Sequence, residues 1–286
     1  MSPSGETVNK RFDGKTAVVT GGGGVLCSVF CRVLAENGCA VAVLDLKEES
    51  AKRVADGINA QGGRAMGVPA NVLDKDSLKN AYERVIAEFG GVDILVNGAG
   101  GNNPRATTDK EFLEPADLEP GHDARTFLDL SKEDIGFVFD LNCLGTLLPT
   151  QTFVPAMKGR EGVIINITSM NAFRPLTKIP AYSAAKSAVS NLTMWLAVHL
   201  SELGIRVNAI APGFFATAQN KQLLFNADGS PTERTEKILR GTPMRRLGEP
   251  EELAGTLLYL CDGRASGFVN GAIIPVDGGF SAYSGV

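Results

Sequence analysis

Seven short apolar runs that alternate with helical patterns constrain the fold of this chain more than any other feature. The runs are almost continuously apolar and rich in β-branched residues, and they cover residues 15–20, 40–44, 64–68, 92–96, 162–167, 205–210 and 272–276. Strands that are apolar on both faces are typical of parallel sheets covered by helices on each side. Helical patterns follow the first three runs and end near Asn37, Gln61 and Phe89. We therefore predict a single-domain, doubly wound α/β fold with a seven-stranded parallel sheet flanked by helices.

Two long segments interrupt this alternation. Residues 101–130 and 213–248 each follow an apolar run and are rich in polar and turn-forming residues. Ligands bind outside the carboxyl ends of the strands in open parallel sheets, so we interpret both segments as substrate loops. Variable surface insertions are the alternative. We expect residues 1–10 to form a flexible polar tail and residues 11–286 to form one domain.

The composition argues against several classes of function. A net charge of −4 gives no indication of nucleic-acid binding. The chain has two histidines, and its five cysteines form no C-x-x-C pair, so we expect no metal site. An odd cysteine count without a secretory signal fits reduced thiols, which indicates a cytoplasmic protein. No apolar stretch reaches the roughly 18 residues that a membrane span needs, so we expect no membrane partner.

A glycine run separates the first apolar run from the first helical pattern. Glycines in such a turn let the backbone approach a pyrophosphate, and the helix that follows supplies N–H donors. The run, residues 21–24, does not have the G-x-G-x-x-G spacing, and a tight turn without a ligand is the alternative. Asp45 ends the second run, where a carboxylate can accept hydrogen bonds from a ribose diol and repel a 2′-phosphate. Asp45 therefore favours NAD over NADP, although it could also cap the helix that begins near Lys47.

Tyr182 and Lys186 stand four residues apart, and Ser169 lies thirteen residues before the tyrosine. On a helix, positions i and i+4 share one face, so the ammonium group of Lys186 can lie near the phenol of Tyr182. A nearby cation favours the phenolate and lowers the phenol pKa from its usual value of about 10. A tyrosine tuned in this way can exchange a proton with an alcohol or ketone oxygen. The alternative is a packed tyrosine beside a surface lysine.

The order of these motifs resembles the short-chain dehydrogenase/reductase family over about residues 12–280. Thr20 and Gly21 match the start of the family's T-G-x-x-x-G-x-G motif, although Val25 and Cys27 hold its two later glycine positions. The resemblance implies a Rossmann-type fold and an NAD(P)-dependent oxidoreductase that acts on CH–OH groups.

The same resemblance assigns site residues. The implied catalytic set is Asn142, Ser169, Tyr182 and Lys186, in which the tyrosine exchanges the proton, the serine binds the substrate oxygen and the asparagine positions a water. Together with Asp45, the expected cofactor contacts are Gly21, Gly24, Val25, Leu26, Asn71, Val72, Asn97, Ala99, Gly100, Tyr182, Lys186, Pro212, Gly213, Phe215 and Thr217. Family members pair the helices that carry Asn142 and Tyr182 across dimer interfaces, so we expect a homotetramer.

Three strings resemble more narrowly the mannonate (fructuronate) oxidoreductase branch of the family. They are N-G-A-G-G-N-N-P-R-A-T-T at residues 97–108, S-M-N-A-F-R-P at residues 169–175 and G-F-F at residues 213–215. The long insertion before Asn142 is a further match. This resemblance implies a small sugar-acid substrate, D-mannonate or D-fructuronate.

The polar residues of these strings suit such a substrate. Amides bind hydroxyl groups, and an arginine can clamp a carboxylate with two parallel hydrogen bonds. We expect Arg105 or Arg174 to be the carboxylate anchor, with a solvated surface charge as the alternative for each. The full set of expected substrate contacts is Asn103, Arg105, Ser169, Asn171, Arg174 and Tyr182.

Two competing functions remain open at this point. One is another sugar or polyol dehydrogenase, such as a gluconate 5-dehydrogenase-like enzyme, because related enzymes share parts of these strings. The other is a catalytically idle nucleotide-binding regulator, which the altered glycine motif at Val25 and Cys27 allows.

Overall fold

The computed structural model describes residues 11–217 and 221–285, and the expected tail at residues 1–10 lies outside these ranges. Its seven strands are β1 (Thr16–Thr20), β2 (Ala40–Asp45), β3 (Arg64–Pro69), β4 (Ile94–Asn97), β5 (Val163–Ile167), β6 (Arg206–Pro212) and β7 (Ile273–Val276). Each strand lies within two residues of the run that predicts it, because a buried apolar run leaves little freedom in where the strand begins and ends.

The described part of the chain also forms α-helices of 4 to 20 residues. They are α1 (Val25–Glu36), α2 (Glu48–Ala60), α3 (Lys75–Phe89), α4 (Lys132–Phe139), α5 (Gly145–Phe153), α6 (Pro180–His199), α7 (Lys221–Leu224), α8 (Glu233–Gly241), α9 (Ala254–Cys261) and α10 (Gly263–Ser266). A π-helical turn at Asp140–Leu144 joins α4 to α5, and short 3-10 helices lie at Pro104–Ala106, Pro115–Leu118, Phe127–Asp129, Val154–Met157, Met170–Ala172, Ser201–Leu203 and Pro250–Leu253. None of the helices in the described ranges is both long and apolar enough to cross a membrane.

All strand pairs are parallel, and the sheet order is β3-β2-β1-β4-β5-β6-β7. The chain builds outward from β1 to β3 and then returns to the other side of β1 with β4, so the order reverses between β1 and β4. Loops leave the sheet in opposite directions at such a point and open a crevice at the carboxyl ends of the strands. The predicted doubly wound α/β fold is confirmed.

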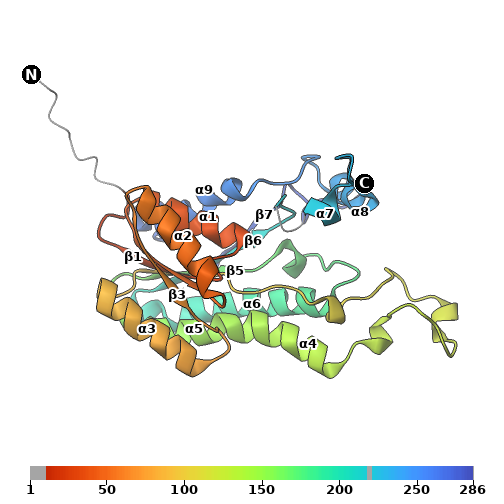
Figure 1. Ribbon diagram of the computed structural model, residues 1–286, viewed down its shortest axis with the longest axis horizontal. Helices are drawn as coiled ribbons and strands as arrows, with labels where there is room; N and C mark the ends of the chain where they lie inside the picture. Colours follow the sequence, from red (N-terminus) through yellow and green to blue (C-terminus); the bar gives the residue numbers. More distant parts are fainter. Residues whose placement is uncertain (1–10, 218–220, 286) are drawn as a thin grey trace, which may run out of the picture.

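Helices cover both faces of the sheet (Figure 1). One core contains Phe30 of α1, Ala55 of α2 and Leu257 of α9, and the other lies under α3, α5 and α6. Neighbouring residues of β1 divide between them, since Val19 belongs to the first core and Val18 to the second. This division follows from the twofold alternation of side chains along a strand.

Both ends of α3 are set by local sequence. Asp74 caps α3 by accepting hydrogen bonds from the backbone N–H groups of Asp76 and Ser77, and Gly90 ends the helix with a φ of 77°. An acidic cap satisfies N–H groups that have no partner within the helix, and glycine adopts the left-handed conformation without a steric penalty.

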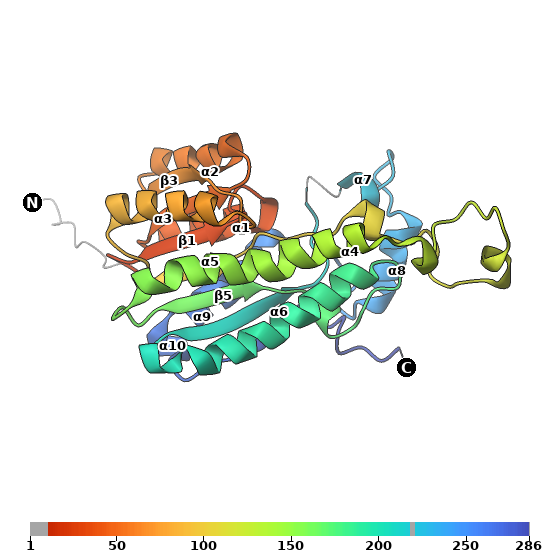
Figure 2. The same ribbon diagram turned by 90° about the horizontal axis from the view of Figure 1, so that it is seen from below.

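The two long segments lie toward the same end of the molecule (Figures 1 and 2). The first projects beyond α4 as an extended loop (Figure 2). The second contains α7 and α8, which the sequence analysis did not predict. Thr232 caps α8 by accepting a hydrogen bond from the N–H of Thr235. The many turn-forming residues before Thr232 conceal this nine-residue helix in the sequence pattern.

Candidate active site

Ser169, Tyr182 and Lys186 meet at the carboxyl end of β5. Ser169 follows the strand and caps a 3-10 turn, and its hydroxyl accepts a 3.2 Å hydrogen bond from the N–H of Asn171. Lys186 lies one turn after Tyr182 on α6, with its Nζ atom 5.7 Å from the centre of the tyrosine ring. The same Nζ atom donates a 2.8 Å hydrogen bond to the carbonyl of Ile167. The predicted i, i+4 geometry therefore places the cation beneath the phenol.

The electrostatics of Tyr182 differ from the expectation. Burial raises the pKa of Tyr182, and a hydrogen bond with Ser169 acts in the opposite direction. Burial also lowers the pKa of Lys186 to about 8. The expected net lowering of the Tyr182 pKa is not found, because desolvation of the buried phenol is the largest effect. A raised pKa favours the protonated phenol.

Asn142 lies in the π-helical turn, a type of bulge that is frequent at functional sites. Its amide nitrogen donates 2.8 Å hydrogen bonds to the carbonyls of Gly101 and Val138, and its amide oxygen accepts from the N–H of Gly101 at 3.2 Å. Both amide hydrogens are therefore used within the protein. A water at this residue would have to bind elsewhere, for example at the backbone.

Gly100 lies between Asn142 and Lys186. A Cβ atom at position 100 would lie 2.7 Å from Oδ1 of Asn142 and 3.1 Å from Nζ of Lys186. Only a residue without a side chain fits between the two groups. Gly100, in the loop after β4, therefore packs between two residues of the predicted catalytic set, Asn142 and Lys186.

The turn between β1 and α1 is built to approach a ligand with its backbone. Gly21 has a φ of 64°, which favours glycine, and Gly24 precedes the first residue of α1, Val25. No side chain in the described ranges caps the N-terminus of α1, so its first N–H groups have no side-chain capping partner. A helix N-terminus of this kind attracts a pyrophosphate through its N–H groups and its dipole. The turn therefore fits a dinucleotide.

Asp45 accepts hydrogen bonds from the glycine turn and from the start of α2. Its Oδ2 atom accepts a 3.1 Å hydrogen bond from the N–H of Gly23, and its Oδ1 atom accepts from the N–H of Lys47 at 3.0 Å. The carboxylate therefore ties the glycine turn to the start of α2. Each carboxylate oxygen has a second lone pair, so a ribose diol could also bind.

The remaining expected cofactor residues on this side surround the same crevice in different ways. The amide oxygen of Asn71 accepts a 3.0 Å hydrogen bond from the N–H of Leu73, and the side chain of Val72 is buried. Asn97 is buried and donates to Thr150 and Asn166 at 2.9 and 2.8 Å. Its side chain therefore joins β4 to β5 and α5, as a structural residue of the sheet.

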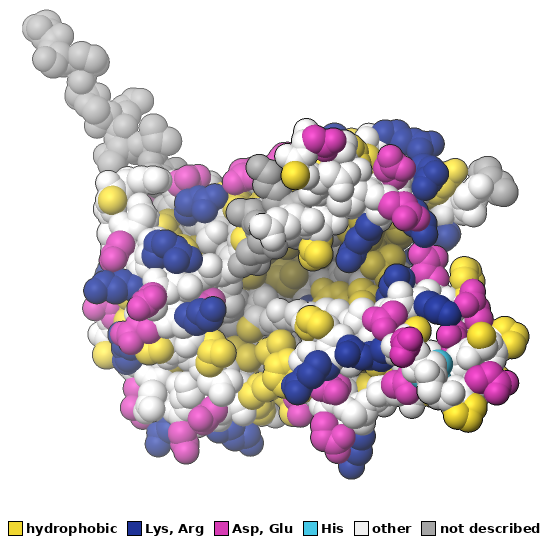
Figure 3. Space-filling model, turned by 45° about the vertical axis from the view of Figure 1, so that its right-hand side comes forward, with side chains coloured by type: hydrophobic (Ala, Val, Ile, Leu, Met, Phe, Trp, Pro, Cys, Tyr) yellow, Lys and Arg dark blue, Asp and Glu magenta, His cyan; other side chains and the backbone are white. Residues whose placement is uncertain are grey.

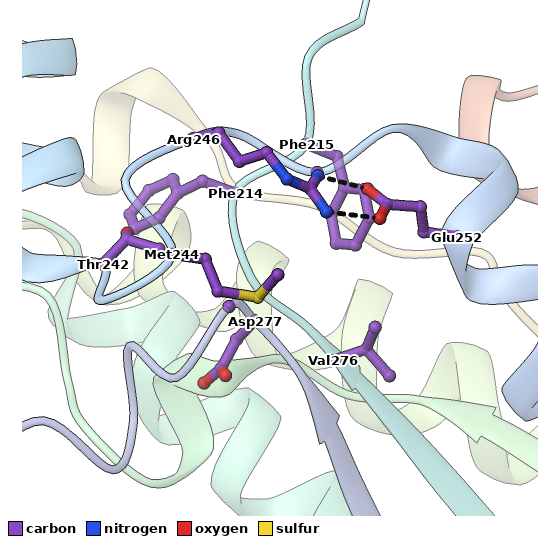
Figure 4. Close-up of a pocket in the computed structure, with 10 residues that line it drawn as sticks. Phe214, Phe215, Thr242, Met244, Arg246, Glu252, Val276 and Asp277 are labelled. Carbon is purple, nitrogen blue, oxygen red and sulfur yellow. Dashed lines mark hydrogen bonds and ion pairs between the residues drawn. The ribbon is translucent and has the colours of Figure 1, made fainter.

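The end of β6 forms the other side of the crevice. Pro212 is the last residue of the strand, and the N–H of Gly213 donates to the carbonyl of Val276 at 2.9 Å. Phe214 and Phe215 line a cavity of about 100 Å³ (Figure 4). Thr217 follows at the end of the described stretch.

The arginine that lines this cavity is held in an ion pair. Arg246 reaches over the cavity but makes two 2.6 Å bonds to Glu252, so its charge is already compensated (Figure 4). Phe214 also packs against Phe280 with ring centres 5.3 Å apart. Phe214 and Phe215 therefore form part of the wall of this cavity.

The two arginines that are expected to bind a substrate carboxylate have different partners in the structure. Arg105 makes a 3.0 Å ion pair with Asp134 of α4, and Asn103 caps a 3-10 turn through the N–H of Arg105. Arg174 lies five residues after Ser169 and donates from Nε to the carbonyl of Ser281 at 2.9 Å. Among the ion pairs of the described residues, Arg105 has a carboxylate partner and Arg174 has none.

Asn171 has an unusual environment. Its side chain is 4% exposed, and its amide oxygen finds no hydrogen-bond partner among the residues that the structure describes. It stands two residues after Ser169, in the 3-10 turn Met170–Ala172 that follows β5. Figure 3 shows this side of the molecule hollowed between the segment that carries α8 and the segment of residues 101–130.

The sequence analysis missed three partners that shape the site. They are the Ile167 carbonyl beneath Lys186, Asp134 beside Arg105 and the Ser281 carbonyl beside Arg174. Only Asp134 leaves a signal in the sequence, because Ser131 and Asp134 have the spacing of a helix cap and its third residue. Within residues 11–217 and 221–285, no group of three metal-ligating side chains comes together.

Sequence comparisons give relatives over nearly the full chain. A family model described as short chain dehydrogenase matches residues 15–227. An uncharacterized oxidoreductase of Haemophilus influenzae is 55% identical over 279 residues, which cover 97% of both chains. The uncharacterized oxidoreductase UxuB of Bacillus subtilis is 51% identical over 280 residues, which cover 98% of this chain and 99% of that protein.

A solved structure agrees with this result. It is described as a putative D-mannonate oxidoreductase from Haemophilus influenza with bound NAD, and it is 54% identical in sequence. It superposes with a TM-score of 0.92 and covers 97% of this chain and 99% of that chain. The family match, the parallel sheet and the Ser-Tyr-Lys geometry lead to one conclusion: the chain belongs to the short-chain dehydrogenase family and is an oxidoreductase.

Proposed function

We propose that this protein is an NAD(H)-dependent oxidoreductase that interconverts a secondary alcohol and a ketone on a sugar acid, with D-mannonate and D-fructuronate as the preferred pair. The observation that carries the proposal is the convergence of Ser169, Tyr182 and Lys186 beside the glycine turn. The bound NAD of a relative that is 54% identical supports the cofactor. Asp45 supports NAD over NADP, because a 2′-phosphate would meet its negative charge.

Bound nicotinamide would supply or accept the hydride, and the protein would handle the proton. Ser169 donates a hydrogen bond to the reacting oxygen and stabilises negative charge that develops on it. Tyr182 gives its phenol proton to that oxygen during reduction and takes it back during oxidation. Since burial raises the pKa of Tyr182, its resting form suits reduction of the ketone.

Lys186 and Asn142 support this proton transfer in different ways. Lys186 is 5% exposed and sits on the Ile167 carbonyl, so its ammonium group stabilises the phenolate that forms during reduction. Asn142 holds the Gly100–Gly101 segment near this lysine through two hydrogen bonds with Gly101, and a third ties its amide to the carbonyl of Val138. We propose that Asn142 acts as a positioning residue for the loop.

A sugar acid accounts for the polar groups near Ser169. The unpartnered amide oxygen of Asn171 can accept a hydrogen bond from a substrate hydroxyl. Arg174 can bind the carboxylate with the guanidinium nitrogens that do not contact Ser281. Arg105 is the weaker choice, because a substrate carboxylate would have to compete with Asp134. Residues 101–130 and 213–248 would enclose this substrate, the latter as a lid.

A spectrophotometric panel at 340 nm tests the proposal. NADH and NADPH are each offered with fructuronate, other uronates, ketogluconates and neutral ketoses, and the Tyr182→Phe variant serves as the inactive control. We expect the highest kcat/KM with NADH and fructuronate. A neutral ketose that reacts faster than every sugar acid would contradict the carboxylated substrate, and faster reaction with NADPH would contradict the cofactor.

The runner-up is a gluconate 5-dehydrogenase-like enzyme, since its substrate also has a carboxylate and several hydroxyl groups. The ketogluconate arm of the panel separates the two. An idle nucleotide-binding regulator would bind NADH and turn over none of the substrates.

We also propose a cytoplasmic homotetramer. Trp195 and Val198 of α6 are exposed apolar residues on one of the helices through which family members pair. Light scattering on the purified protein would give the mass of the assembly, and a monomer would contradict the proposal.

A further inference from the structure

We propose that Cys27 is a cofactor-positioning residue whose thiol group fills the space that a side chain at position 98 would occupy. Cys27 and Gly98 then form a matched pair that sets the distance between the start of α1 and the loop after β4. The inference rests on the proposed binding of a nicotinamide dinucleotide. It explains how the turn can work although Val25 and Cys27 replace two glycines of the family's motif.

Gly98 is required for space and not for its backbone conformation. Its φ is not positive, so an L-residue would suffer no backbone strain there. A Cβ atom at this position would overlap the Sγ atom of Cys27, and it would lie 2.9 Å from the carbonyl oxygen of Thr20. Cys27 is 5% exposed and cannot swing into solvent. A methyl group at position 98 would therefore push α1 and the β4 loop apart.

The contact lies within a network that reaches the cofactor turn. The N–H groups of Gly98 and Ala99 donate to the hydroxyl of Thr20 at 3.1 and 3.2 Å. A Cβ atom on Gly21 would lie 3.0 Å from the backbone of Ala99, so the two loops already touch. A displacement at Gly98 would move the N–H groups that face the pyrophosphate.

The thiol acts here through its size. Burial raises the pKa of Cys27 to about 12, so the group is neutral at physiological pH. A neutral, buried thiol is a poor nucleophile and behaves as a small apolar side chain.

A double-mutant cycle tests the pairing. Gly98→Ala, Cys27→Gly and the combined variant are compared with the wild type by NADH titration without substrate and by thermal unfolding without NADH. We expect Gly98→Ala to weaken NADH binding roughly tenfold and the combined variant to recover to within about threefold of the wild type. Additive effects in the combined variant would overturn the proposal.

A second pair of variants decides the question if Gly98→Ala does not fold. Cys27→Ser keeps the size of the side chain, whereas Cys27→Val adds volume toward Gly98. We expect unchanged NADH affinity in the first and affinity reduced about tenfold in the second. Equal affinities in both would overturn the proposal. Cys261→Ala, which removes a thiol from the same core at α9, is the control and should lower the unfolding temperature without changing NADH affinity.

The wild-type titration separates the two levels of inference. If the wild type does not bind NADH, the proposal that NAD(H) is the cofactor is wrong. Binding by the wild type without coupling between positions 27 and 98 would remove only the role of Cys27.

Discussion

The cofactor side and the substrate side of the crevice present different kinds of atoms to their ligands. On the cofactor side, glycines at positions 21, 23, 98 and 100 each leave less than a normal contact distance for a Cβ atom. On the substrate side, Arg105 and Arg174 reach out from exposed segments, and Arg105 has a side chain that is 71% exposed. Adding a single methyl group on the cofactor side should therefore reduce activity strongly. Truncating an arginine side chain on the substrate side should reduce it less.

The largest effect should come from the residue at which the two sides meet. Tyr182→Phe removes the proton donor and keeps the ring, so we expect kcat to fall by about 10²–10⁴-fold. NADH binding should stay within about twofold, since the ring still packs beside Lys186. Stopped-flow turnover and NADH titration on the same sample measure both quantities. A variant that retains a tenth of wild-type turnover would show that another group transfers the proton.

The strongest test of the crowded cofactor side is Gly100→Ala. The added methyl group would press on Oδ1 of Asn142 and Nζ of Lys186, and a displacement of about 1 Å near the reacting atoms can cost about 100-fold in kcat. Gly57→Ala on α2 is the matched control, because a Cβ atom there meets nothing within 4 Å. Steady-state kinetics with saturating NADH should show loss in the first variant and none in the second. Equal activity would mean that the Asn142–Gly100–Lys186 packing is not needed.

Asp45 tests the cofactor side through charge. Asp45→Asn removes the negative charge, so we expect NADH binding to weaken about tenfold and the preference over NADPH to shrink. Asp262→Asn at the cap of α10 is the control, since it changes a capping carboxylate whose partners are Arg11 and the N–H of Arg264. The ratio of kcat/KM for NADH and NADPH is the measurement. An unchanged ratio would leave Asp45 as a purely structural link between Gly23 and Lys47.

The sequence predicts the two sides unequally, for physical reasons. The strands, the order of the motifs and the pairing of Tyr182 with Lys186 depend on local periodicity, so their positions could be predicted. The direction of the Tyr182 pKa could not, because burial depends on how α6 packs in three dimensions. The ion pair between Arg105 and Asp134 joins residues 29 positions apart. The spacing of Ser131 and Asp134 indicates the start of a helix but not this long-range pairing.

The smallest expected effects lie on the substrate side and distinguish its two arginines. Arg174→Ala should raise the KM for fructuronate about tenfold and leave the KM for a neutral ketose within about twofold, because it removes a charged partner of the carboxylate. Arg105→Ala should change either KM by less than about twofold, since an exposed ion pair with Asp134 contributes little. Steady-state kinetics of both variants on both substrates provide the comparison. A larger effect in Arg105→Ala would place the carboxylate beside residues 101–130, and it would imply that substrate binding breaks the ion pair with Asp134.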